Sequence, residues 1–290
     1  MQPRGHEGPV ALVTGGGNGI GKAIAIRLAE ERDARVVIAD IDSEAGEAVA
    51  RQVGGLFVPC DVSSYAANQA AVDAALSHHG RLDIAALNAG VAPDFDLGED
   101  YDPARFRQLV GINLIGVGDG AHLAYMAMRE CGGGDIIATS SIAGMLPVPL
   151  EPLYASTKHG VVGLVRGQGP AWDDVRLNAI CPGFADTKII DRSRGMLERA
   201  GIQVMDPNEV AEAFATILAG GGTGQCFTVL PGQPVRPFEF AEMPGLAEAS
   251  YPDPVSVRRT SRRAPGGAPH GQIGPAGAPR TSNGPGARRR

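Results

Sequence analysis

The sequence is poor in cysteine and has no long hydrophobic run. Its four cysteines, Cys60, Cys131, Cys181 and Cys226, form no CxxC pair and have no histidine at a spacing suited to zinc. We therefore expect reduced thiols, no metal site and a cytoplasmic protein. No apolar segment reaches the ~18 residues that a membrane helix needs. Residues 1–8 also lack the apolar core of a secretion signal. The sequence thus predicts neither a membrane span nor export.

Basic residues are too few for a general nucleic-acid-binding protein, because the formal net charge is −6. From residue 241 onward, however, eight arginines face three acidic residues, so this part carries about +5 and the rest about −11. Residues 252–290 are rich in Pro, Gly, Ala, Ser and Arg, and such a composition cannot offset the entropy of ordering. We predict one folded domain over 1–240 and a disordered tail over 241–290. Its arginines leave contact with RNA or an acidic partner open, although a solvated tail is the simpler interpretation.

Short β-rich runs alternate with helix-length segments along the first 240 residues. The runs expected as strands are 10–14, 35–40, 56–61, 83–88, 135–140, 175–180 and 225–230. The segments expected as helices are 19–31, 43–53, 64–79, 104–130 and 154–167, with a further helix beginning near Pro207 and capped by Asp206. Apolar strands joined by helices indicate a parallel sheet covered on both faces. The predicted fold is a single-domain α/β protein, a Rossmann-type doubly wound sheet in three α/β/α layers.

A glycine-rich turn follows the first predicted strand directly. The run Thr14-Gly15-Gly16-Gly17-Asn18-Gly19-Ile20-Gly21 leads into a helical pattern. Such a turn lets backbone N–H groups approach a pyrophosphate at the N-terminus of a helix. Residues 16–22 also fit GxxxxGK, the start of a nucleoside triphosphate P-loop. Ala23 follows where a P-loop needs a hydroxyl for magnesium, so the sequence favours a dinucleotide.

The second predicted strand ends at Asp40, 19 residues past Gly21. A carboxylate at this position accepts hydrogen bonds from ribose hydroxyls and repels a 2′-phosphate. Neither Gly16, Gly17 nor Ile41 offers a cation for that phosphate. The sequence therefore predicts NAD rather than NADP as the cofactor.

The chain resembles the short-chain dehydrogenases/reductases, in their compact single-domain branch, over about residues 8–232. The turn at 14–21 matches the cofactor turn of that family, and Asp61-Val62 matches its adenine-pocket pair. The run 88–90 matches most of its Asn-Asn-Ala-Gly motif, and 182–187 matches the loop that holds the nicotinamide end. The residues that the motifs and the resemblance assign to cofactor binding are Gly15, Asn18, Gly19, Ile20, Gly21, Asp40, Ile41, Asp61, Val62, Asn88, Ala89, Gly90, Tyr154, Lys158, Pro182, Gly183, Ala185 and Thr187.

Asn113, Ser141, Tyr154 and Lys158 fall where the family keeps its catalytic tetrad. The resemblance implies an NAD-dependent alcohol dehydrogenase or ketone reductase in which Tyr154 is the acid/base and Ser141 binds the substrate oxygen. It also implies that Lys158 holds the nicotinamide ribose and that Asn113 anchors a water linked to Lys158. A non-catalytic dinucleotide sensor or regulatory subunit is the alternative, since a fold alone does not specify function. The intact tetrad favours the enzyme.

The pairing of Tyr154 with Lys158 also has a chemical rationale of its own. Residues four apart share one face of a helix. A free phenol has a pKa of about 10, too high for a base at neutral pH. An ammonium about 4 Å away contributes roughly 4 kcal/mol at an effective dielectric near 20. This would lower the pKa of the phenol by up to ~3 units.

Four features depart from the family or bear on the substrate. Leu87 replaces the first Asn of the Asn-Asn-Ala-Gly motif, which predicts looser hydrogen bonding beneath the sheet. Gly and Pro in 167–170 should end the helix of Tyr154 early, in a region where the family forms dimers or tetramers. The resemblance still implies a homodimer or homotetramer. Two further segments, the apolar 145–150 and the mixed apolar and basic 189–205, predict an apolar secondary alcohol or ketone with a polar or anionic end.

Overall fold

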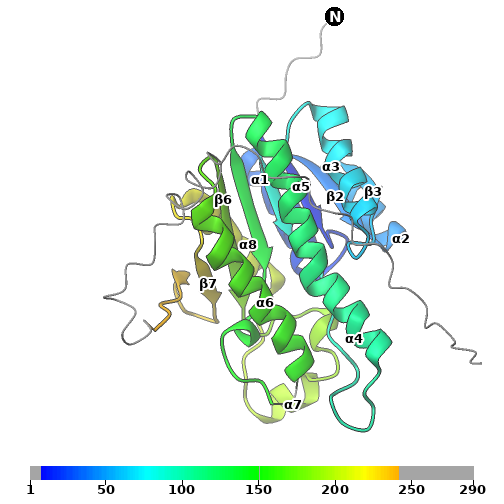
Figure 1. Cartoon of the computed structure of the whole chain (residues 1–290), viewed down its shortest axis with the longest axis vertical. Helices are drawn as coiled ribbons and strands as arrows, with labels where there is room; N and C mark the ends of the chain where they lie inside the picture. Colours follow the sequence, from blue (N-terminus) through cyan, green and yellow to red (C-terminus); the bar gives the residue numbers. More distant parts are fainter. Residues whose placement is uncertain (1–7, 150, 242–290) are drawn as a thin grey trace, which may run out of the picture. The chain divides into compact units, whose positions relative to one another are not determined.

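One sheet organises the computed structural model, which describes residues 8–149 and 151–241 (Figure 1). In this part of the chain the sheet has 8 strands in the order β3-β2-β1-β4-β5-β6-β7-β8. All neighbours pair in parallel except β7 and β8. The strands are β1 Val10–Thr14, β2 Arg35–Asp40, β3 Leu56–Pro59, β4 Ile84–Leu87, β5 Gly134–Thr139, β6 Val175–Pro182, β7 Cys226–Val229 and β8 Arg236–Pro237.

Helices cover both faces of this sheet. One buried apolar cluster lies under α3, α5 and α6, and a second lies under α1, α2 and α8. The predicted three-layer Rossmann-type fold is therefore confirmed. The helices are α1 Gly19–Arg32, α2 Ser43–Val53, α3 Tyr65–His79, α4 Pro103–Val110, α5 Gly116–Glu130, α6 Pro152–Gln168, α7 Arg194–Arg199 and α8 Pro207–Ala219.

The strand order creates a cleft at the carboxyl edge of the sheet. From β1 the chain moves outward through β2 and β3, and it then returns to the other side of β1 as β4. The loops after β1 and β4 therefore diverge, and ligands of such sheets bind at this switch point. Figure 1 shows α4 and α7 beyond the same edge of the sheet.

Most of the predicted elements form, with two local differences. The strands expected at 56–61 and 83–88 are shorter, ending at Pro59 and Leu87. The helix expected at 104–130 is interrupted by a π-helical turn, Gly111–Ile115, between α4 and α5. Helical structure therefore covers the whole predicted segment, and the π turn within it depends on tertiary contacts that helical periodicity does not encode.

Two predicted helix boundaries are confirmed, namely the C-terminus of α6 and the N-terminus of α8. Helix α6 ends at Gln168, and a 3-10 turn, Gly169–Ala171, follows. A side chain on Gly169 would meet the backbone of Gly224 at 2.5 Å, so this turn packs closely against the loop before β7. Asp206 caps α8, where it accepts the N–H of Asn208 at 2.7 Å.

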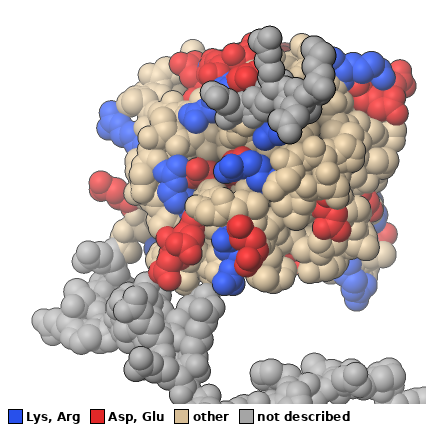
Figure 2. Space-filling model, turned by 90° about the horizontal axis from the view of Figure 1, so that it is seen from above, with Lys and Arg blue, Asp and Glu red and all other residues tan. Residues whose placement is uncertain are grey.

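The surface in Figure 2 carries acidic and basic groups close to one another. Two ion pairs lie at the amino ends of the strands: Arg81 contacts Asp83 at 2.5 Å, and Arg176 contacts Asp135 at 2.6 Å. In the described residues, no helix has both the length and the hydropathy to cross a bilayer. The predicted tail over 241–290 lies outside the described residues except for Ala241, and so do residues 1–7.

Candidate active site

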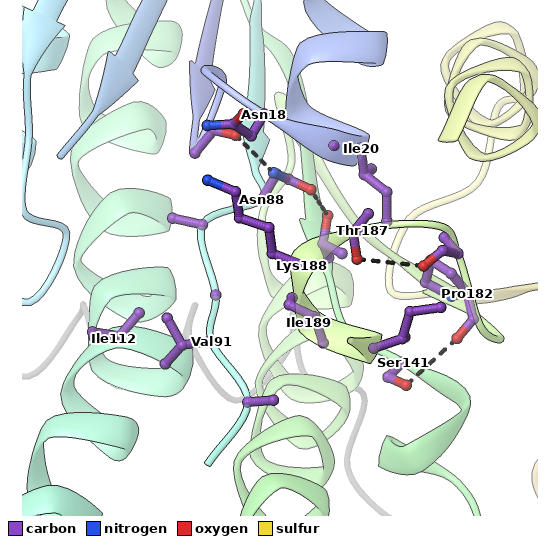
Figure 3. A pocket seen from close by; sticks show the side chains of 18 of the residues that line it. Asn18, Ile20, Asn88, Val91, Ile112, Ser141, Pro182, Thr187, Lys188 and Ile189 are labelled. Atoms are coloured by element: carbon purple, nitrogen blue, oxygen red, sulfur yellow. Dashed lines mark hydrogen bonds between the residues drawn. The ribbon is translucent and has the colours of Figure 1, made fainter. Parts of the chain in front are cut away.

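A cavity of about 790 Å³ occupies the switch point at the carboxyl edge of the sheet. The loops after β1, β2, β3, β4, β5 and β6 and the start of α6 line it (Figure 3). Of the residues that the sequence assigned to the site, all but Gly21 and Asn113 line this cavity. Seven separate segments thus bring the predicted residues together in one place.

The glycine-rich turn leaves the N-terminus of α1 open to the cavity. Gly15 and Gly19 have positive φ angles of 62° and 51°, which L side chains rarely adopt. A Cβ on Gly21 would lie 2.1 Å from the carbonyl oxygen of Gly15, so the first turn of α1 packs on the turn itself. The N-cap residue Asn18 makes no side-chain hydrogen bond to the helix. No side chain of the N-cap residue occupies the first N–H groups of α1. These groups can therefore donate to a pyrophosphate.

Asp40 lines the cavity at the end of β2, and two hydrogen bonds fix the orientation of its carboxylate. Its Oδ2 accepts the N–H of Gly17 at 2.8 Å, and its Oδ1 accepts the N–H of Asp42 at 2.9 Å. The neighbouring thiol of Cys60 also lines the cavity. Burial, together with the charges of Asp61 and Asp40, raises its pKa to about 11, so this thiol stays neutral. An acidic surface of this kind suits the hydroxyls of an adenosine ribose.

Asn88 connects the loop after β4 to the glycine-rich turn. Its Nδ2 donates to the carbonyl oxygens of Thr14 and Gly15, both at 3.3 Å, and its Oδ1 accepts the hydroxyl of Thr139 at 3.3 Å. The hydroxyl oxygen of Thr14 in turn accepts the N–H of Asn88 at 3.0 Å. This network fixes the spacing of the two diverging loops. Leu87, which replaces the first Asn of the motif, is buried instead.

Tyr154 and Lys158 lie on one face of α6, as the spacing predicts. Both line the cavity, and Lys158 Nζ is 5.6 Å from the centre of the Tyr154 ring. Lys158 is buried, with 2% of its surface exposed, and its Nζ donates to the carbonyl oxygen of Thr139 at 2.9 Å. Ser141 comes from the loop after β5, accepts the N–H of Ala143 at 3.1 Å and donates to the carbonyl oxygen of Pro182 at 3.4 Å, and its hydroxyl lies close enough to lower the pKa of the Tyr154 phenol.

The electrostatics of this pair differ from the prediction that Lys158 lowers the pKa of Tyr154. Burial raises the pKa of the Tyr154 phenol above its usual value, the hydrogen bond from Ser141 lowers it, and the charge of Glu151 raises it. Burial also lowers the pKa of the Lys158 ammonium to about 8. Desolvation penalises the charged form of each group and is the largest cause of both shifts. In the protein without cofactor the pKa of Tyr154 is thus raised, whereas the sequence argument predicted a fall of up to ~3 units.

Asn113 acts from behind the cavity. It lies on the π turn, is fully buried, and its side-chain amide pairs with both backbone groups of Val91 at 2.9 Å. Its Nδ2 also contacts the hydroxyl of Thr157 on α6 at 3.3 Å. Asn113 thus fastens the loop after β4 to the helix that carries Tyr154 and Lys158.

The loop after β6 closes over the glycine-rich turn. Ala185 pairs with Met205 in a short parallel bridge, which joins the two ends of the segment 186–204. The Cγ2 atom of Thr187 would lie 2.8 Å from a Cβ on Gly19, and its hydroxyl donates to the carbonyl oxygen of Ala185 at 3.3 Å. This contact requires a glycine at 19.

Several lining residues were not predicted, and one predicted segment does not line the cavity. Residues 91–93 and Ile112 form an apolar wall of the cavity. Residues 91–93 directly follow the predicted run 88–90 in the sequence, and Ile112 faces that run. Their closeness to this run is the signal that could have predicted them. The described part of the predicted rim, 145–149, is absent from the lining, and Leu150 lies outside the described residues. In the described residues, no group of His, Cys, Asp or Glu is arranged to hold a metal ion.

Comparisons with known proteins identify the family. A model of the short chain dehydrogenase family matches residues 9–197, more than half of the chain. The chain belongs to the short-chain dehydrogenase family. It is 35% identical to levodione reductase of Leifsonia aquatica (72% of this chain, 79% of that protein) and 39% identical to mouse 15-hydroxyprostaglandin dehydrogenase [NAD(+)] (63% and 70%). A 3-ketoacyl-(acyl-carrier-protein) reductase from Brucella melitensis, solved with NADH, superposes with a TM-score of 0.71 at 31% identity (78% and 98%).

These relatives bear on two predictions made from the sequence. The family and its NAD-dependent members confirm an NAD-dependent oxidoreductase of alcohols and ketones, and nothing in the comparisons favours a non-catalytic sensor. Two stretches of this chain, 158–163 and 175–184, resemble 15-hydroxyprostaglandin dehydrogenase in particular, and that enzyme is among the relatives found. Both stretches build scaffold and cofactor site, so they say little about the substrate.

The Asp40 carboxylate makes a testable prediction about cofactor choice. Asp40→Asn keeps the shape of the side chain but removes its charge, so we expect NADH to bind about tenfold more weakly and NADPH to gain relative to NADH. Dissociation constants for both cofactors, measured from cofactor fluorescence, check this. Asp42→Asn is the control, since Asp42 lies outside the cavity and caps α2. Equal discrimination between the two cofactors in Asp40→Asn and the wild type would contradict it.

Proposed function

We propose that this chain transfers a hydride between a secondary alcohol or its ketone and NAD, with Tyr154 as the acid/base. The observation that carries the proposal is the meeting of three groups at one end of the cavity. The Tyr154 phenol, the Ser141 hydroxyl and the Lys158 ammonium lie beyond the glycine-rich turn, so a substrate carbon placed beside them also lies beside the nicotinamide end of a dinucleotide. When bound, the nicotinamide supplies the hydride acceptor or donor.

The residues of the chain supply the proton chemistry and the geometry. In ketone reduction Tyr154 donates its proton to the substrate oxygen while Ser141 holds that oxygen by a hydrogen bond. In alcohol oxidation the tyrosinate removes the hydroxyl proton, which requires the raised pKa of Tyr154 to fall. A cationic ring beside the phenol and the ammonium of Lys158 both favour the anionic form.

Replacement of the tyrosine tests this role directly. Tyr154→Phe removes the proton donor but keeps the ring, so we expect turnover to fall by about 10² to 10⁴-fold while NADH binding is retained. Initial rates at 340 nm against a panel of secondary alcohols, together with NADH titrations, check both parts. Tyr65→Phe is a matched control, because Tyr65 is exposed on α3 and lies outside the cavity. Unchanged turnover in Tyr154→Phe would show that another group carries the proton.

The wall of the substrate end supports an apolar substrate with one anionic group. Residues 91–93, Ile112, Ile189 and Ile190 provide apolar surface. Two arginines line the same region, but Arg194 is paired with Asp186 at 2.6 Å and Asp191 at 3.2 Å. Arg192 makes no ion pair within the described residues, which leaves its guanidinium for an anionic end of the substrate.

Matched pairs of substrates test this specificity. For a secondary alcohol with a carboxylate and for its methyl ester, we expect Arg192→Ala to raise the KM of the acid about tenfold and to leave the ester and both kcat values nearly unchanged. Arg199→Ala is the control, since Arg199 lies on α7 outside the cavity. A preference of the wild type for small hydrophilic polyols, or equal effects on acid and ester, would reject this substrate class.

The cellular context and the assembly also belong to the proposal. The four cysteines are free thiols, which supports a cytoplasmic protein. Ile115 and Met126 are exposed at 51% and 44%, on the π turn and on α5, and this supports a homodimer or homotetramer formed through α5 and α6. We assign the enzyme to a single domain over 1–240 and treat 241–290 as a tail outside it.

A further inference from the structure

Lys188 is a lining residue that the proposed reaction does not use. It follows Thr187 directly and begins the short helical turn Lys188–Ile190. It lines the same cavity as the glycine-rich turn. In Figure 3 its side chain extends from the loop after β6 across the cavity, toward the side where Asn18 and Asn88 lie. Since Thr187 packs against Gly19, the backbone of Lys188 starts beside that turn.

The charges around the glycine-rich turn explain what a cation at position 188 contributes to cofactor binding. At the cavity, α1 contributes the partial positive charge of its N-terminus, about half an elementary charge. The other charged residues at the adenosine end, Asp40 and Asp61, are acidic and disfavour a dianionic group nearby. A cation that reaches a pyrophosphate on the first N–H groups of α1 therefore adds to the compensation of its charge.

The other cations that line the cavity are engaged or lie elsewhere. Lys158 is buried and donates to Thr139, and Arg194 is paired with Asp186 and Asp191. Arg192 belongs to the substrate end of the same segment. Lys22, on the first turn of α1, is exposed and does not line the cavity. Lys188 has no ion pair within the described residues, so its ammonium is available to the cofactor.

We propose that Lys188 binds the pyrophosphate of NAD from the side opposite to α1. The dinucleotide is then held between the backbone N–H groups of the glycine-rich turn and an ammonium carried by the loop after β6. Because Lys188 opens the segment that continues to Ile189, Ile190 and Arg192, this contact also ties the wall of the substrate end to the bound cofactor.

Binding measurements with two ligands test the proposal without relying on turnover. Lys188→Ala should weaken both NADH and ADP about tenfold at low salt, because both ligands carry the pyrophosphate and ADP lacks the nicotinamide half. NADH is followed by its fluorescence and ADP by calorimetry. The loss should shrink as the salt concentration rises. Lys188→Arg should restore binding to within about twofold of the wild type, since it keeps the charge.

Two control variants separate a direct contact from a general effect of charge. Lys22→Ala removes the same charge from α1, and Arg199→Ala removes a charge from α7, outside the cavity, and both should bind NADH and ADP as the wild type does. The proposal is overturned if Lys188→Ala binds both ligands normally, or if it loses NADH affinity but keeps that for ADP, which would place the lysine at the nicotinamide half. An equal loss in Lys22→Ala would also overturn it.

Discussion

Desolvation at the start of α6 is the constraint on which the site depends. The helix places a phenol and an ammonium one turn apart, but it buries both of them against the sheet. Burial favours the neutral form of each group, so the pair is more nearly neutral than two solvated groups at this separation would be. Lys158 remains hydrogen-bonded to Thr139, which keeps the ammonium in position. Removal of a proton from an alcohol by Tyr154 therefore depends on charge that arrives with the cofactor.

The fold supports this arrangement from several distant points of the chain. Asn88 ties the loops after β1 and β4 together, and Asn113 ties the loop after β4 to α6 through Val91 and Thr157. Together the two asparagines connect the glycine-rich turn to α6 through the loop after β4. Their side-chain amides therefore set the distance between the turn and this helix. Such polar connections in the interior stay specific because each amide is satisfied.

Local patterns in the sequence predicted much of this structure. The strands, the glycine-rich turn and the shared face of Tyr154 and Lys158 follow from periodicity and from residue types over a few positions, and all of them form. The π turn at 111–115, the place of residues 91–93 in the cavity wall and the sign of the pKa shift at Tyr154 were not predictable in this way. Each depends on what packs around a residue from elsewhere in the chain. The direction of the Lys188 side chain likewise depends on the tertiary path of the loop after β6.

The most direct test of this account is the ionisation of Tyr154 itself. NMR of protein carrying tyrosine labelled with ¹³C at the ζ carbon, with Tyr154→Phe to assign the signal, follows the phenol during a pH titration. The account predicts a pKa above that of free tyrosine in the protein alone and a clear fall when NAD binds. A tyrosinate already present at neutral pH without the cofactor, or a pKa unchanged by NAD, would contradict it.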